Sequence, residues 1–137
     1  MSHPTPLLIK GVQLFSGLDD ATIDRLADDF VLRQFDTGAI IAAEGSGGLN
    51  FFVIESGEAE VTVHGEAVAT LGPGASFGEV ALVDKDARSA TVTARSPITA
   101  HALPVWSFRS FVETRPDVAW KLLEILADRL RAAESRH

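Results

Sequence analysis

The chain has 137 residues, about the size of one domain, and 46% of them are hydrophobic, which is enough to bury an ordinary core. It has no cysteine, which excludes disulfides, thiolate metal ligands and thiol catalysis. Its formal net charge of −7 argues against direct binding to nucleic acid or to an anionic membrane, since both are recognised by clustered lysine and arginine. It has neither an apolar run of membrane-spanning length nor the zones of a signal peptide, so we expect a cytoplasmic location.

The first 30 residues predict an arm followed by one helix. Residues 1–10 contain Pro4 and Pro6 and are expected to be extended. From Leu18 to Phe30 the apolar residues approach helical spacing, and Asp19 or Asp20 is available as the N-cap. A first helix is therefore predicted at about residues 19–30.

Residues 31–103 predict an all-β region, because short apolar stretches alternate with Gly, Ser, Asn and Pro at an interval typical of a sandwich or barrel. The clearest alternation of apolar and polar residues runs over 58–64, which predicts a half-buried strand. The residues of its buried face are Ala59, Val61 and Val63. Gly65 follows at a predicted hairpin turn, and residues 68–71 are expected to return antiparallel.

The last third predicts two helices, at about residues 104–135. Pro104 suits a first helical position, and the apolar face after it, which includes Trp106, is typical of a helix packed on the β-region. Pro116 interrupts this helix, and Asp117 is expected to cap a final amphipathic helix that carries Trp120. The apolar stripe of that helix consists of Val118, Leu122, Ile125, Leu126, Leu130 and Ala133. Core packing is the favoured interpretation of this stripe and of both tryptophans, with a dimer seam as the alternative for the stripe.

One segment interrupts the strand pattern and carries the chemistry. Residues 72–78 contain three glycines, which permit close backbone approaches, and Glu79 to Leu82 can form one helical turn directly afterwards. The free amide groups at the start of such a turn would face an anion.

Arg88 is the predicted partner of that anion. It shares its parity with Ala90, Val92 and Ala94, so it is expected on the buried side of the strand. An unpaired buried guanidinium would cost several kcal/mol, and its planar fork suits a phosphate. Ser89 adds a hydroxyl, so a phosphate between Gly78 and Arg88 would satisfy both sets of donors.

These residues carry a family resemblance. Phe-Gly-Glu-Val-Ala-Leu at 77–82, followed by Arg-Ser-Ala-Thr-Val at 88–92, resembles the phosphate-binding cassette of cyclic-nucleotide-binding domains, which include the effector domain of catabolite activator protein. Residues 38–45 and 52–58 resemble the two glycine-punctuated strand signatures of that family, and the likeness runs from about residue 14 to 131. It implies a single α+β domain over 1–137. Its β-roll or jelly-roll barrel would have about eight antiparallel strands, with an N-terminal helix, a short cassette helix and two C-terminal helices.

The resemblance also implies a role for each residue of the site. Arg88 would pair with the cyclic phosphate, helped by Ser89 and by the amides near Ala81 and Ala90, and Glu79 would accept a hydrogen bond from the ribose 2′-hydroxyl. The other implied positions are Gly78 and Val80 in the cassette, Val61, Val68 and Ala69 beside the base, and Arg129 near the lid. The hydroxyl pair that reads adenine in catabolite activator protein is replaced by Ala133 and Glu134, which leaves the choice between cyclic AMP and cyclic GMP open.

The implied function is that of a regulatory sensor without catalysis or cofactor, which binds a cyclic nucleoside monophosphate and moves the last two helices. Cyclic AMP is the favoured ligand and cyclic GMP the alternative. Its partners would be a second copy of the chain or a separate effector, with no direct nucleic-acid or membrane contact. One alternative is a ligand-free β-roll scaffold or dimerisation module, with Arg88 and Glu79 as a structural ion pair. A second is a small β-barrel enzyme. No serine motif supports it, however, and His64 and His101 lack metal-ligand spacing. The chain is also compatible with a fragment of a longer regulator or channel.

Overall fold

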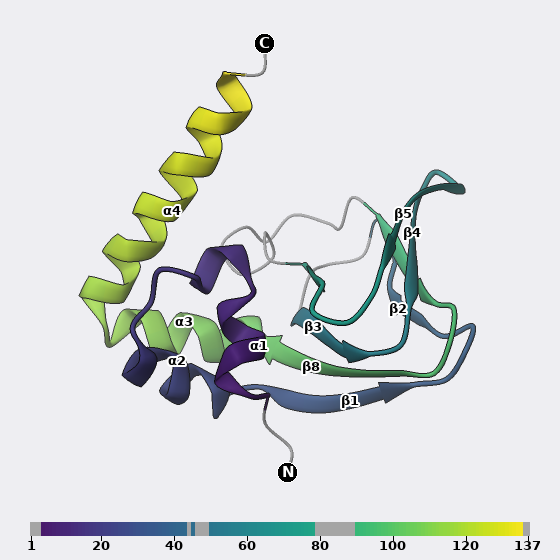
Figure 1. The fold of residues 1–137 in the computed structure, drawn as a ribbon, viewed down its shortest axis with the longest axis horizontal. Coiled ribbons are helices and arrows are strands. Elements are labelled where there is room, and N and C mark those ends of the chain that lie inside the picture. The colour runs from purple at the N-terminus through teal and green to yellow at the C-terminus, as the bar shows by residue number, and fades with distance from the viewer. Residues whose placement is uncertain (1–3, 44, 46–49, 79–89, 136–137) are drawn as a thin grey trace.

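The chain folds as a group of helices beside a β-roll of two sheets (Figure 1). The computed structural model describes residues 4–43, 45, 50–78 and 90–135. The helices are α1 (Pro6–Lys10), the 3-10 helix η1 (Gln13–Phe15), α2 (Asp20–Ala27), α3 (Val105–Glu113) and α4 (Pro116–Glu134). The strands are β1 (Val31–Phe35), β2 (Ile40–Ala42), β3 (Asn50–Ser56), β4 (Ala59–Val63), β5 (Glu66–Leu71), β6 (Ser76–Phe77), β7 (Thr91–Ala94) and β8 (Ile98–Pro104).

The two four-stranded sheets are wholly antiparallel, in the orders β1-β8-β3-β6 and β2-β7-β4-β5. The predicted fold class is confirmed, although the sheets face each other as a roll and do not close into a barrel. The predicted cassette helix lies outside the described residues. The apolar cluster inside the roll consists of Ala42, Phe52, Ile54, Ala59, Val92, Ala94, Ile98, Ala100 and Ala102.

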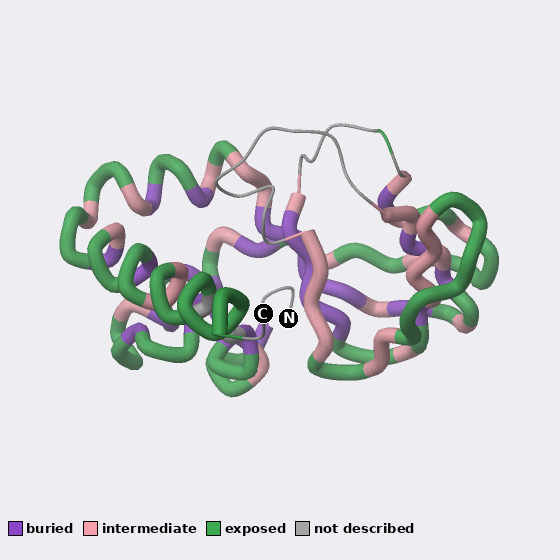
Figure 2. The backbone as a smooth tube through the Cα atoms, turned by 90° about the horizontal axis from the view of Figure 1, so that it is seen from above, coloured by how far each residue is buried: buried purple, intermediate pink, exposed green. Residues whose placement is uncertain are grey.

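A second apolar cluster lies on the outer face of the sheet β1-β8-β3-β6, beneath the helices. Phe51 and Val53 of β3 are fully buried in it. The Phe15 ring of η1 lies 5.7 Å from the Phe51 ring, edge to face, and 6.1 Å from the Phe108 ring of α3. This sheet therefore has a core on both faces, one beneath the helices and one inside the roll. Figure 2 shows buried stretches of backbone in the middle of the molecule, between its helical part and the far side of the roll.

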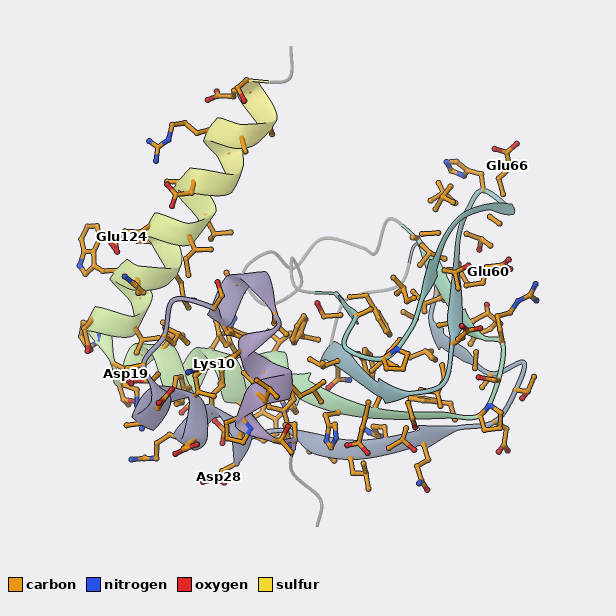
Figure 3. All side chains as sticks on the ribbon, viewed as in Figure 1. Lys10, Asp19, Asp28, Glu60, Glu66 and Glu124 are labelled. Atoms are coloured by element: carbon orange, nitrogen blue, oxygen red, sulfur yellow. The ribbon has the colours of Figure 1, made fainter. Side chains whose placement is uncertain are left out.

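The prediction of an extended N-terminal arm is wrong, because α1 occupies part of it. Thr5 is its N-cap, with Oγ1 accepting a hydrogen bond from the Leu8 amide at 3.3 Å. Pro6 stands at the first helical position, where its missing N–H costs nothing and its φ angle is already helical. Lys10, which is labelled in Figure 3, forms an ion pair with Asp20 and so links α1 to the start of α2.

The C-terminal helices begin differently from the prediction. Pro104 is the N-cap of α3 and not its first residue. Asp117 was expected to cap α4, but that helix begins at Pro116 itself and Asp117 lies in its first turn. The start of α4 has the same reason as the start of α1, because proline is favoured at the first position of a helix.

The outer faces of α3 and α4 are less buried than predicted. Trp106 is 74% exposed and Trp120 is 70% exposed, so the prediction that both pack in the core is wrong. On α4 the buried residues of the stripe are Val118 and Leu122, whereas Leu130 is 62% exposed on the part that projects away from the roll (Figure 1). None of the helices in the described part of the chain is both long and apolar enough to cross a membrane.

Candidate functional site

The predicted phosphate site falls on a connection between the two sheets. The described chain stops at Gly78, directly after β6, and resumes at Ala90, directly before β7. Because β6 is the edge of one sheet and β7 an inner strand of the other, the segment 79–89 joins the sheets. Five predicted site residues lie in this segment and hence outside the described residues: Glu79, Val80, Ala81, Arg88 and Ser89.

Aromatic rings support the entrance to this segment. Gly78 has a φ of +83°, a left-handed conformation that favours glycine. The Phe77 ring beside it stacks on the Phe52 ring of β3, with centroids 5.0 Å apart and planes 21° apart. The Phe35 ring lies edge to face with the Phe52 ring, with centroids 6.1 Å apart. The sequence analysis gave these rings no role, although Phe77 belongs to the quoted motif and Phe52 opens the second strand signature.

The strand at the exit of the segment has the predicted alternation. Val92 and Ala94 are buried, whereas Thr91 and Thr93 are only partly buried. β7 begins at Thr91, and Ala90 is a partly buried residue just before it. The parity that places Arg88 on the interior side therefore holds along β7, while Arg88 itself lies outside the described residues.

The predicted base-contacting residues separate into two environments. Val61 of β4 lies directly opposite Val92 of β7 and Ala69 of β5, and residues opposite each other in antiparallel strands point to the same face. Val61 packs against the interior cluster, so these three residues form an apolar patch on the inner wall of the roll. Val68 falls at a shift of register between β4 and β5 and is 58% exposed.

The described interior of the roll brings no charge to this patch. Among the described residues, His101 is the only buried polar or charged side chain, and its Nε2 lies 2.7 Å from Oε1 of Glu55. His101 alternates with the interior-facing Ala100 and Ala102 on β8, so it faces away from the roll interior. No group of metal-ligating side chains occurs in the described part of the chain. A cation for a bound phosphate must come from elsewhere, and the segment 79–89 contains Lys85 and Arg88.

Arg129, predicted near the lid, lies on α4 in the part that follows Leu126. Its side chain is outside the described part of the structure, so the ligand contact of Arg129 stays a prediction.

Comparison with known proteins identifies the family. The model of the cyclic nucleotide-binding domain matches residues 32–115, more than half of the chain. The chain belongs to the cyclic nucleotide-binding domain family. The predicted family is thereby confirmed, and the predicted function of cyclic-nucleotide sensing agrees with it. Domains of this family are regulatory and generally non-catalytic.

The similar proteins carry the matching region within longer chains. The cAMP-dependent protein kinase regulatory subunit of Yarrowia lipolytica is 41% identical over 97 residues, which cover 69% of this chain and 26% of that protein. Glutaminase 2 of Bradyrhizobium diazoefficiens is 33% identical over 128 residues, which cover 90% of this chain and 20% of that protein. The chain thus spans a fifth to about a quarter of the length of these relatives.

A solved structure matches the fold over nearly all of both chains. The N-terminal domain of a transcriptional regulator from Streptomyces coelicolor A3(2) superposes with a TM-score of 0.87 and 27% sequence identity. The match covers 93% of this chain and 95% of that one.

Proposed function

We propose that this domain binds a cyclic nucleoside monophosphate, with cyclic AMP preferred, on the inner wall of the roll beneath residues 79–89. The observation that carries the proposal is the position of the two strands, β6 and β7, that flank the cassette in the chain. The two ends of the cassette leave from opposite sheets, and the patch of Val61, Ala69 and Val92 lies on the inner wall of the sheet at its exit. The Yarrowia relative, named for cyclic AMP, supports the preferred base.

The proposed roles divide the ligand between a charged and an apolar part. Arg88 binds the cyclic phosphate bidentately, with Ser89 and the amides near Ala81 and Ala90 as further donors. The Glu79 carboxylate accepts a hydrogen bond from the ribose 2′-hydroxyl. The base lies against Val61 and Ala69, where an apolar wall suits its face.

The proposed output is mechanical, with no catalysis and no cofactor. Binding draws the cassette inward and shifts α3 and α4, at a coupling free energy of about 1–3 kcal/mol. The receiver is a second copy of the chain or an effector domain or protein in the cytoplasm.

Titration calorimetry with cyclic AMP and with cyclic GMP tests the proposal. Arg88→Ala is expected to weaken binding by about tenfold or more, because about 1.5–3 kcal/mol of charged hydrogen bonding is lost. Arg95→Ala is the matched control, because the Arg95 side chain is exposed and reaches Glu60 at 3.4 Å on the outside of the roll. This variant should bind like the unchanged chain.

Two outcomes would contradict the proposal. If neither nucleotide produces heat or thermal stabilisation, the ligand-free scaffold is the better description. If nucleotide binds but Arg88→Ala and Arg95→Ala bind it equally well, the phosphate site is elsewhere. Turnover of the nucleotide would instead favour an enzyme.

A further inference from the structure

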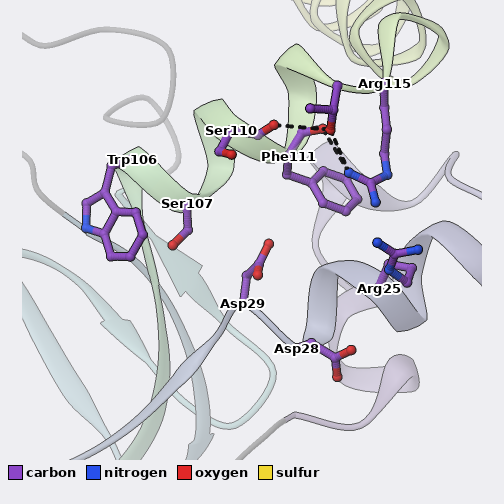
Figure 4. A pocket seen from close by; sticks show the side chains of 9 residues that line it. Arg25, Asp28, Asp29, Trp106, Ser107, Ser110, Phe111 and Arg115 are labelled. Carbon is purple, nitrogen blue, oxygen red and sulfur yellow. Dashed lines mark hydrogen bonds between the residues drawn. The ribbon is translucent and has the colours of Figure 1, made fainter.

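A pocket of about 360 Å³ lies between the end of α2 and the face of α3, in the helical part of the molecule (Figure 4). Asp28 and Asp29 line it from the end of α2, and Trp106 and Ser107 line it from α3. Its volume is at the lower end of the range for ligand sites, about 300–1,000 Å³. Nothing in the proposed nucleotide site uses it.

Asp29 is the acidic group of this pocket that faces α3. It is partly buried, its carboxylate points toward α3, and no hydrogen bond or ion pair from the described residues reaches that carboxylate. Burial raises the pKa of Asp29, the neighbouring Asp28 raises it further, and Arg115 and Arg25 only partly offset this. The carboxylate therefore forms no ion pair with either arginine in the described structure.

The nearby Arg115 is already engaged. Its Nη1 donates to the Phe111 carbonyl oxygen at 3.2 Å and to Thr114 Oγ1 at 3.0 Å. Its guanidinium also lies over the Phe111 ring, 4.2 Å from the centroid. These contacts hold it at the far side of the pocket from Trp106 (Figure 4).

Trp106 forms the opposite wall. Its side chain is 74% exposed although it carries a large apolar surface, and such tryptophans are typical of protein interfaces. The face of an indole ring attracts a cation by about 0.5–1 kcal/mol at an exposed site. The residues that follow the C-terminal end of α2, Asp28 and Asp29, line this pocket, and that helix end contributes negative potential.

We propose that this pocket receives a basic side chain, arginine or lysine, of a partner protein. Asp29 forms the ion pair, the Ser107 hydroxyl accepts a hydrogen bond, and the indole of Trp106 covers the alkyl stem and the charge. Charge complementarity favours a protein partner of this kind. The chain carries a formal net charge of −7, and the two arginines that line the pocket, Arg25 and Arg115, lie on the side away from Trp106 (Figure 4).

The test uses the 137-residue chain with Trp120→Phe, which leaves Trp106 as its only tryptophan. The probe is the capped tripeptide acetyl-Gly-Arg-Gly-amide, and the readouts are tryptophan fluorescence and the NMR signal of the indole N–H. Saturable binding is expected, with a dissociation constant on the order of 1 mM that rises with salt. The peptide with neutral citrulline in place of arginine should bind about tenfold more weakly.

Two variants locate the site by NMR. Asp29→Asn, which keeps the shape of the side chain, is expected to reduce affinity at least about fivefold, a loss comparable to one charge-assisted interaction. Glu124→Gln on α4 removes an acid that does not line this pocket and should leave the affinity unchanged. The proposal is overturned if the citrulline peptide binds equally well, or if Asp29→Asn has no effect. It is also overturned if a glutamate peptide binds more tightly, which would indicate an anion site at the two arginines.

Discussion

Gly57, a glycine of the second strand signature, lies where the fold leaves no room for a side chain. It follows β3 with a φ of +93°, where only glycine is comfortable. A Cβ atom there would lie 2.3 Å from the Pro97 carbonyl oxygen and 2.9 Å from Cγ1 of Ile98. The obstacle is backbone as well as side chain, so local adjustment cannot relieve it cheaply.

Gly57→Ala is therefore expected to lower the free energy of unfolding by about 2–5 kcal/mol, from backbone strain and overpacking together. Gly38→Ala is the matched control, because Gly38 has a similar φ of +91° but open space around its Cβ position. It should cost only about 1–2 kcal/mol. Urea denaturation measures both, and equal losses would show that the contact with Pro97 does not matter.

Among the elements, the β4–β5 hairpin determines which residues face the proposed ligand. His64 and Gly65 form a two-residue turn with φ angles of 51° and 81°, the pattern of a type I′ hairpin. This turn pairs Val63 with Glu66, and the later shift of register brings Ala69 opposite Val61. The wall of the patch thus depends on the turn and on the shift together.

The other decisive element is α4, which in the described structure packs on the helical core from Val118 to Leu126. Trp120, Leu123 and Leu130 are 70%, 53% and 62% exposed and follow a three-then-seven spacing, which places them along one side of the helix. An apolar stripe on a projecting helix suits the dimer contact that we propose as one output of the domain.

We expect the chain to be a dimer in sedimentation-velocity experiments and Leu123→Glu to shift it to monomer, because a charge in an apolar seam is costly to bury. Leu7→Glu is the control, since Leu7 is 80% exposed on α1, and it should leave the dimer intact. A chain that stays monomeric at all concentrations, with or without nucleotide, would contradict this assignment.

At the scale of the whole molecule, one sheet links the ligand wall to the helices. Phe51 and Phe52 are neighbours on β3, yet Phe51 packs under the helices and Phe52 packs inside the roll. A displacement of the roll interior can therefore be transmitted to α3 through the sheet that both clusters share. This packing supplies a physical path for the proposed coupling.

Two aspartates, Asp29 and Asp19, should change the free energy of unfolding in opposite directions as the pH rises, because their pKa values are shifted in opposite directions. The pKa of Asp29 is raised, mainly by burial, so the folded state holds its proton more tightly and stability falls as the pH rises through that window. The pKa of Asp19 is lowered by hydrogen bonds from the side chain and amide of Thr22, so its stabilisation is present above the ordinary pKa and is lost as the pH falls.

Asp29→Asn is therefore expected to raise the urea midpoint at pH 7, and Asp19→Asn to lower it. Both differences should shrink below about pH 4, where the unperturbed carboxyl group takes up its proton. A destabilising Asp29→Asn at pH 7 would show that the two arginines already compensate its charge.

The sequence by itself determined the fold class, the β4–β5 hairpin and the family. These rest on local features: the two-residue alternation around Val61, a glycine at a tight turn, and the two halves of the cassette at a set distance. The sequence is also the sole source for the roles of Glu79 and Arg88, which lie outside the described structure.

Only the tertiary structure decided which side of each amphipathic helix is covered. Trp106 and Trp120 are large apolar residues on amphipathic helices, but no neighbour covers them in the described structure, and exposure depends on segments far away in sequence. For the same reason the local sequence did not indicate the register shift at Val68 or the pocket at Asp29. Periodicity predicts that a helix has an apolar face, whereas the three-dimensional packing of the whole chain determines what that face meets.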